Sequence, residues 1–282
     1  MRPHLHKLRG QPRIALTRLR GQHLLSDKAA VAKIIAAAEL TAEDAVLEIG
    51  SGLGALTREI ASRAGRLVAV ELDPLYADAL RKEFEAKPRI FVIEGDILKM
   101  RIYDLIEAPY KLITNLPYNI TSAFLKKFLI EPPHPRLMVV MVQKEVAERI
   151  CGTTNNQQPT TKNPSSMLGL MCNLYAECSL VVKVPAGAFS PPPRVDSAVV
   201  KFVPYSEKAF SAKWGFEIGI AEDFLAFANR FFAAPRKKMS SLLPKPLALK
   251  LRATLAGLRE SPDSRPAALS LVKWVELWKM MK

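Results

Sequence analysis

The alternation of apolar runs with amphipathic stretches between residues 28 and 142 limits the folds open to this chain more than any other feature. Apolar runs predict strands at residues 45–49, 67–71, 90–93, 111–114 and 137–142. Helix-spaced apolar positions predict helices at residues 28–38, 53–64, 75–85 and 122–130. Near-continuous apolar strands that alternate with helices are typical of a parallel sheet covered on both faces. The sequence therefore predicts an α/β fold.

The alternation stops after residue 151. Residues 152–166 are polar and aperiodic, which predicts a loop, and residues 167–173 then predict a helix. Two β-rich runs, at residues 179–184 and 198–203, flank a proline-rich turn. They could close the sheet as an antiparallel pair, which gives a mostly parallel sheet of seven strands.

The periodicity becomes helical after Pro204, which predicts a small all-helical C-terminal domain. Its helices are expected at residues 222–232, 247–258 and 268–280. The opening residues are basic and contain prolines, as expected of an N-terminal arm. We therefore expect a basic arm at residues 1–20, an α/β domain at residues 21–205 and a helical domain at residues 206–282.

Positive charge is concentrated near the two ends of the chain, whose net charge is +14. Two stretches contain no acidic residue, and their basic residues are Arg2, Lys7, Arg9, Arg13, Arg18 and Arg20, and Arg230, Arg236, Lys237, Lys238, Lys245, Lys250 and Arg252. Basic segments at both ends suggest a polyanion held from two sides. Charge clustering favours nucleic acid over an anionic membrane surface or a merely solvated face.

Nothing in the sequence indicates export or insertion into a membrane. No apolar run approaches the roughly 20 residues needed to cross a bilayer. The N-terminus lacks the apolar segment of a signal peptide. The cysteines Cys151, Cys172 and Cys178 have no metal-ligand spacing and suggest no disulfide framework. We expect a cytoplasmic protein without a metal.

The turn after the first predicted strand is rich in glycine and follows an acidic residue. The segment EIGSGLG at residues 48–54 has the spacing G-x-G-x-G. Nicotinamide-dependent dehydrogenases instead need the longer G-x-G-x-x-G spacing and a proton-handling residue. The tighter spacing is typical of methyltransferases that use S-adenosylmethionine. Gly50 and Gly52 are therefore predicted to approach that cofactor closely.

Polar residues also follow the next three predicted strands. Glu71 ends the second strand roughly 20 residues further on, where a carboxylate can bind both ribose hydroxyls. Asp96 follows the third strand and could accept from the adenine amine of the cofactor, and Asn115 ends the fourth. Ligands bind in the crevice at the carboxyl edge of such sheets, so these residues predict one site.

Asn115-Leu116-Pro117-Tyr118 has the pattern of an amino-group methyltransferase site. The exocyclic amine of adenine is a poor nucleophile, because its lone pair is delocalised into the ring. The Asn115 side-chain oxygen and the Leu116 carbonyl could accept its two N–H bonds and favour a pyramidal nitrogen. Pro117 fixes φ and has no donor of its own, and Tyr118 offers a face for base stacking.

Several segments, in this order, resemble one enzyme family. They are QHLL at residues 22–25, EIGSGLG at 48–54, VELD at 70–73, GD at 95–96, NLPYN at 115–119, QKEV at 143–146, FSPPPRVDSAV at 189–199 and RKK at 236–238. Together they resemble the bacterial ribosomal RNA adenine dimethyltransferases that act on the small subunit. The resemblance extends from about residue 21 to the C-terminus.

The resemblance implies a Rossmann-like class I methyltransferase that uses S-adenosylmethionine. It implies that His23 and Leu25 line the cofactor pocket and that Phe189 lies against the target adenine, opposite Tyr118. It also implies that the helical domain seats RNA through Arg230, Arg236, Lys237 and Lys238. The expected reaction dimethylates the N6 amines of two adjacent adenines near the 3′ end of small-subunit ribosomal RNA. The expected partner is an immature small subunit, and a monomer would suffice.

Three departures from the family pattern stand out. Ser51 replaces the usual proline, and Leu24 replaces a common phenylalanine. Residues 152–166 replace a shorter loop of the family, so RNA contacts that the family makes through that loop do not carry over to this chain from the resemblance. The resemblance also leaves two rivals: a large-subunit adenine methyltransferase of the macrolide-resistance type, and a noncatalytic ribosome-assembly or transcription factor on the same fold.

Overall fold

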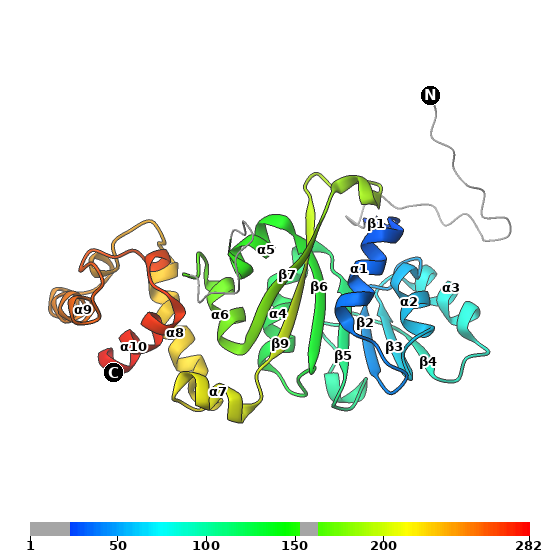
Figure 1. Ribbon diagram of the computed structural model, residues 1–282, viewed down its shortest axis with the longest axis horizontal. Coiled ribbons are helices and arrows are strands. Elements are labelled where there is room, and N and C mark those ends of the chain that lie inside the picture. Colours follow the sequence, from blue (N-terminus) through cyan, green and yellow to red (C-terminus); the bar gives the residue numbers. More distant parts are fainter. Residues whose placement is uncertain (1–22, 153–162) are drawn as a thin grey trace.

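The computed structural model describes residues 23–152 and 163–282 and contains a seven-stranded sheet with a group of helices beyond one end (Figure 1). The predicted arm at residues 1–20 and most of the predicted loop at 152–166 lie outside the described residues. In the part described, no helix is both long and apolar enough to cross a membrane.

The sheet confirms the predicted fold class. Its strands are, in spatial order, β4 (Ile90–Glu94), β3 (Arg66–Glu71), β2 (Ala45–Ile49), β5 (Lys111–Asn115), β6 (Leu137–Gln143), β9 (Ser197–Pro204) and β7 (Ala176–Val184). Only β9 runs antiparallel to its neighbours β6 and β7. The chain leaves β2 in one direction through β3 and β4 and returns to β5 on the other side. This reversal creates a switch point between the carboxyl ends of β2 and β5, where open α/β sheets bind ligands.

Helices cover both faces of the sheet, as near-continuous apolar strands require. Val46 and Leu47 of β2 are both fully buried but belong to different hydrophobic clusters, because successive strand residues point to opposite faces. One cluster packs under α1 (Lys28–Ala38), α2 (Ala55–Ala61) and α3 (Pro74–Phe84). The other packs under α4 (Thr121–Ile130), α5 (Lys144–Cys151) and α6 (Met167–Tyr175).

The helix ends show where sequence signals succeed and where they fail. The side chain of Asp27 caps α1 and that of Asp73 caps α3, as acidic residues commonly do just before a helix. Helix α2 begins later than predicted because Gly54, with φ of 81°, is its N-cap residue, and it also ends earlier, at Ala61. The short helices α5 and α7 (Glu207–Trp214) were not predicted.

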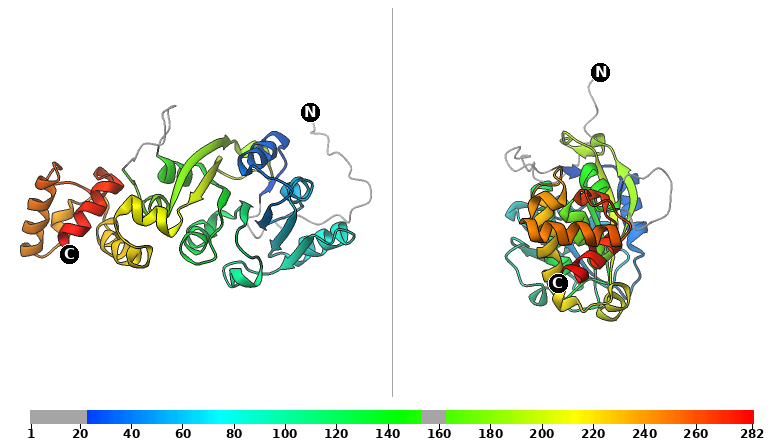
Figure 2. Two further views of the ribbon diagram at one scale, coloured as in Figure 1. Left: turned by 60° about the horizontal axis from the view of Figure 1, so that its bottom comes forward. Right: turned by 90° about the vertical axis from the view of Figure 1, so that its left-hand side faces the viewer.

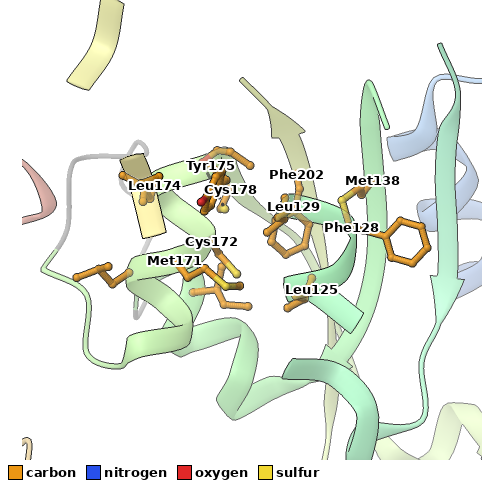
Figure 3. Packing of buried hydrophobic residues seen from close by; sticks show 14 of the residues in the cluster. Leu125, Phe128, Leu129, Met138, Met171, Cys172, Leu174, Tyr175, Cys178 and Phe202 are labelled. Carbon is orange, nitrogen blue, oxygen red and sulfur yellow. Dashed lines mark hydrogen bonds between the residues drawn. The ribbon is translucent and has the colours of Figure 1, made fainter. Parts of the chain in front are cut away.

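The C-terminal helices extend the packing of the second face. Figure 3 shows Leu125 and Leu129 of α4 near Phe202 of β9, with Leu174 of α6 further out. Trp214 of α7 donates from Nε1 to the carbonyl of Leu174 at 2.9 Å. The same cluster continues into α8 (Ala221–Phe232), α9 (Lys245–Gly257) and α10 (Leu271–Met281), which lie beyond α7 (Figure 2). The boundary at residue 205 stays a prediction, because the apolar packing crosses it.

The amino end of the sheet holds an ionic group that we name the Asp44 cluster, formed by the buried Asp44 and Lys111 and the more exposed Arg136. Lys111 Nζ lies 2.9 Å from Asp44 Oδ2 and donates to the carbonyl of Glu39 at 2.5 Å. Arg136 binds the other carboxylate oxygen of Asp44, and the backbone N–H of Thr41 donates to Oδ2 at 2.7 Å. Both Asp44 and Lys111 are buried. Every charge in this cluster therefore has a partner. Pairing matters here because an unpaired charge is costly to bury in a low dielectric.

Candidate functional site

The glycine loop after β2 brings backbone, rather than side chains, to the switch point. Gly50 and Gly52 have φ of 73° and 51°, in the left-handed region that favours glycine. A Cβ atom on Gly50 would lie 3.5 Å from the carbonyl oxygen of Asn115. The loop and the end of β5 are therefore adjacent, as the strand ends predicted.

Glu71, at the end of β3, organises this loop. Its carboxylate accepts from the backbone N–H of Gly52 at 2.7 Å and from that of Asp73 at 2.9 Å. Burial raises the pKa of Glu71, while these two hydrogen bonds oppose the shift. A carboxylate offers about four lone-pair directions, so ribose hydroxyls could still bind it. The backbone contacts also hold the carboxyl in a defined orientation.

Glu48, the acidic residue before the glycines of the loop, also belongs to this site. Its side chain is buried, and its pKa rises to about 8, first because of burial and then because of the nearby Glu71 charge. Among the described residues, Glu48 Oε2, Ser51 Oγ and Thr57 Oγ1 are buried without a hydrogen bond of standard geometry. The hydroxyls of Thr57 and Ser51 still lie close enough to oppose the rise in pKa. Unpaired buried polar atoms are rare in proteins, and a bound polar ligand is one reason for them.

Asp96 follows β4 and is more open to solvent than Glu71. Its Oδ1 accepts from the backbone N–H of Leu98 at 3.0 Å, and Lys99 Nζ lies 3.7 Å from Oδ2. The side chain is 34% exposed, so it can still accept a bond from a bound molecule. Its predicted contact with the adenine amine of the cofactor stays a prediction.

Asn115, Leu116, Pro117 and Tyr118 form the turn that leaves β5. Leu116 is buried, whereas Asn115, Pro117 and Tyr118 are partly exposed. The Asn115 side-chain N–H donates to the carbonyl of His23 at 3.4 Å, which leaves its side-chain oxygen outside that bond. The Tyr118 hydroxyl lies 2.6 Å from the hydroxyl oxygen of Ser197, a residue that no local sequence signal singles out.

Segments far apart in the sequence meet over this turn. Leu24–Leu25 (β1) pairs with Phe189–Ser190 (β8) as a small antiparallel sheet. The His23 ring is hydrogen-bonded through Nδ1 to the carbonyl of Pro191 at 2.9 Å. Its centroid lies 6.2 Å from that of Tyr118. The structure thus brings His23 to the Asn115 turn and Leu24 to the glycine loop, where its Cδ2 atom would lie 2.9 Å from a Cβ atom on Gly52. Leu25 is buried in the cluster under α1, and its predicted place in the cofactor pocket stays a prediction.

Phe189 is nearly buried, with 4% of its surface exposed, and it pairs with Leu25 within the hydrophobic cluster under α1. A clamp on a base would need part of this ring to become accessible. Its predicted role opposite Tyr118 therefore stays a prediction.

The predicted RNA-binding residues lie in the helical region, apart from the sheet edge (Figure 1). Lys238 Nζ lies 2.8 Å from Asp263 Oδ2, and Arg252 binds the other oxygen of that carboxylate at 3.1 Å. Arg230, Arg236 and Lys237 are exposed and form no ion pair with any residue that the structure describes. These three are therefore more available to an anionic partner than Lys238.

Within residues 23–152 and 163–282, no group of three or more His, Cys, Asp or Glu side chains is placed to hold a metal ion. The cysteines Cys172 and Cys178 are buried, and burial raises the pKa of both thiols. A buried thiol with a raised pKa is a poor nucleophile, so these two residues are best explained by packing.

Comparison with known proteins identifies close relatives. A family model described as ribosomal RNA adenine dimethylase matches residues 17–215. Ribosomal RNA small subunit methyltransferase A of Dehalococcoides mccartyi (strain CBDB1) is 40% identical over 263 residues, which cover 91% of this chain and 85% of the relative. The protein of the same name from Gloeobacter violaceus is 36% identical over 265 residues, which cover 91% and 90%.

Two solved structures share the fold over most of their length. The 23S rRNA methyltransferase ErmE has a TM-score of 0.71 at 26% identity, covering 92% of this chain and 99% of that one. A dimethyladenosine transferase from Plasmodium falciparum has a TM-score of 0.70 at 23% identity, covering 90% and 96%. The second likeness concerns the fold alone.

Proposed function

Because this chain belongs to the ribosomal RNA adenine dimethylase family, we propose that it dimethylates the N6 amines of two adjacent adenines near the 3′ end of small-subunit ribosomal RNA. One observation carries the proposal. The glycine loop after β2 and the Asn115 turn after β5 meet at the switch point of the sheet, where a cofactor and a base can be neighbours.

The residues at the switch point fit S-adenosylmethionine. Left-handed glycines allow close backbone approach, Glu71 offers a fixed carboxylate, and the unpaired oxygen of Glu48 could accept a bond from a polar ligand. When bound, the cofactor supplies an activated methyl group on a sulfonium. Gly50, Gly52, Glu71 and Asp96 would hold it, with His23 and Leu25 covering it from the N-terminal side.

The Asn115 turn would hold the base. The side-chain oxygen of Asn115 and the carbonyl of Leu116 would accept the two N–H bonds of the amine and align its lone pair with the methyl group. Tyr118 would stack against the ring, which must leave its helix or lie in a loop to reach the pocket. No general base is needed in this scheme, because the proton can leave after transfer.

The relatives favour the small subunit as the substrate. Proteins named for the small subunit are 40% and 36% identical to this chain, whereas the 23S rRNA enzyme ErmE is 26% identical. We place the RNA contacts at Arg230, Arg236 and Lys237, with Lys238 held back by Asp263. An immature small subunit as partner, a monomeric state and a cytoplasmic location belong to the same proposal.

The test is methyl transfer to purified ribosomal particles. The full chain is incubated with labelled S-adenosylmethionine and with immature small subunits or large subunits, and the labelled base is identified after digestion. We expect dimethyladenosine in small-subunit RNA only. Label confined to large-subunit RNA would overturn the substrate, and tight binding without transfer would favour a noncatalytic assembly factor.

A further inference from the structure

Ser197 and Tyr118 join strand β9 to the turn after β5 through their hydroxyl groups. Their oxygens are 2.6 Å apart, although the residues are 79 positions apart in the sequence. Ser197 is fully buried at the start of β9, and Tyr118 lies in the turn after β5. The bond therefore connects a strand inside the sheet with the turn that would hold the base.

Ser197 is held firmly on both sides. In the sheet it pairs with Gln143 of β6 and with Val184 of β7. The preceding residue, Asp196, is also fixed: its carbonyl accepts from the backbone N–H of Lys144, and its carboxylate accepts from that of Ala186, each at 3.0 Å. The hydroxyl of Ser197 thus projects from backbone that is bonded in several directions.

Tyr118 has weaker local support. It begins a single 3₁₀ turn (Tyr118–Ile120), and its side chain is only partly buried. Burial raises the pKa of its phenol and the bond to Ser197 opposes that shift, as expected if the serine can donate. Fixing the hydroxyl at one end and Cβ at the other prevents the ring from swinging. Rotation about its long axis is the freedom that remains.

We propose that Ser197 is a positioning residue for methyl transfer, which acts through the Tyr118 hydroxyl to hold the ring where the target adenine stacks. The inference rests on the proposed function, since it needs a base against Tyr118. It differs from a packing role for Ser197, because it requires the phenol hydroxyl as the intermediary.

A double-mutant cycle tests this coupling. Ser197→Ala, Tyr118→Phe and the double variant are compared with the natural chain in single-turnover methyl transfer to immature small subunits. A hydrogen bond of ordinary strength predicts that each single change slows transfer about 5- to 10-fold. In the Tyr118→Phe background, Ser197→Ala should have almost no further effect, because its partner is already absent.

Controls separate positioning from folding. Ser197→Thr keeps the hydroxyl and should restore most of the rate, and Ser211→Ala in α7 removes a serine away from the pocket and should leave it unchanged. Should Ser197→Ala fail to fold, Tyr118→Phe still decides, because it removes the same bond without changing β9.

A normal rate for Tyr118→Phe, or an equal loss from Ser197→Ala in both backgrounds, would overturn the inference. Absence of transfer by the natural chain would instead overturn the proposed function.

Discussion

The two ends of strand β5 have opposite polar environments. Lys111 begins the strand inside the Asp44 cluster, where Asp44, Lys111 and Arg136 are all paired. Asn115 ends it beside the glycine loop, where oxygens of Glu48, Ser51 and Thr57 are buried without a standard hydrogen bond among the described residues. The charges of the Asp44 cluster are therefore paired, whereas the loop at the carboxyl end leaves three polar atoms without a standard hydrogen bond. Outside the cluster, His134 Nδ1 before β6 is also buried without such a bond among the described residues.

This difference separates stability from function. Attraction between paired buried charges offsets part or all of their desolvation cost, whereas removal of one partner leaves the desolvation penalty of the other uncompensated. Buried polar groups without a partner, by contrast, destabilise the free protein and persist where the surrounding structure supports them, often at ligand sites. We therefore expect mutations at the amino end to change stability and mutations at the carboxyl end to change activity.

The largest effect should follow Lys111→Met, which leaves Asp44 buried with only Arg136 as its charged partner. We expect the free energy of unfolding to fall by about 3–5 kcal/mol, as for other broken buried pairs. Denaturant titration measures it, with the exposed Lys33→Met as a matched control that should stay within about 0.5 kcal/mol. A Lys111→Met variant that keeps its stability but loses methyl transfer would contradict the assignment of stability to the amino end of β5 and activity to its carboxyl end.

Asn115→Ala should have the converse effect. Loss of the oxygen that would hold the amine should slow single-turnover transfer about 100- to 1,000-fold, the range seen when one aligned polar group is removed from an active site. RNA binding and the denaturation midpoint should change little, and both are measured on the same preparation. A near-normal rate would remove Asn115 from the proposed mechanism.

Glu48→Gln tests whether the buried Glu48 side chain is protonated, through the pH dependence of the free energy of unfolding. Because the folded-state pKa of Glu48 is about 8 and its ordinary value is 4.5, the folded chain holds a proton that the unfolded chain has lost between these values. The free energy of unfolding therefore falls as pH rises across that window, by on the order of 2–4 kcal/mol for this group. Without cofactor, the glutamine variant should lose less stability from pH 5 to 8 than the natural chain. Parallel curves for the two proteins would contradict the buried, protonated state.

The amino end should respond to pH in the opposite direction. Burial tends to raise the pKa of Asp44, but its hydrogen bonds to Lys111 and Thr41 and the charges of Lys111 and Arg136 outweigh that effect and lower it. A lowered folded-state pKa contributes stability above the ordinary value of 3.8, and that contribution is lost as pH falls through the lower value. In acid unfolding, Asp44→Asn should therefore show a shallower dependence on pH than the natural chain.

The smallest effect should follow substitution of basic residues in the helical region, which lies away from both ends of strand β5. Arg236→Gln and Lys237→Gln, made as separate variants, should each weaken RNA binding. Each should also reduce the slope of log affinity against log salt by about one, for one lost phosphate contact. Lys238→Gln should change the slope less, because Asp263 already pairs with Lys238. Slopes that equal the slope of the natural chain for all three variants would remove this surface from the RNA site.

Repeating local patterns allowed much of the fold to be predicted. Helix α1 spans the predicted residues, and the five parallel strands from β2 to β6 begin within one residue of their predicted starts. The acidic caps and the polar strand ends were readable because each depends on neighbours in sequence. Helix α5 was missed although its apolar residues recur at helical spacing, because it follows β6 directly, without a loop to mark its start, and α7 was missed as well.

By itself, the sequence determined the sheet, its strand ends and the family of the enzyme, because these follow from periodicity and from short motifs in a defined order. Only the tertiary structure decided which side chains meet. Tyr118 contacts Ser197, which lies 79 positions away in the sequence, and Arg136 binds Asp44, which lies 92 positions away. It also decided which polar groups remain unpaired, as at Glu48. Such facts depend on the packing of distant segments and on exclusion of water, which no local pattern of residues records.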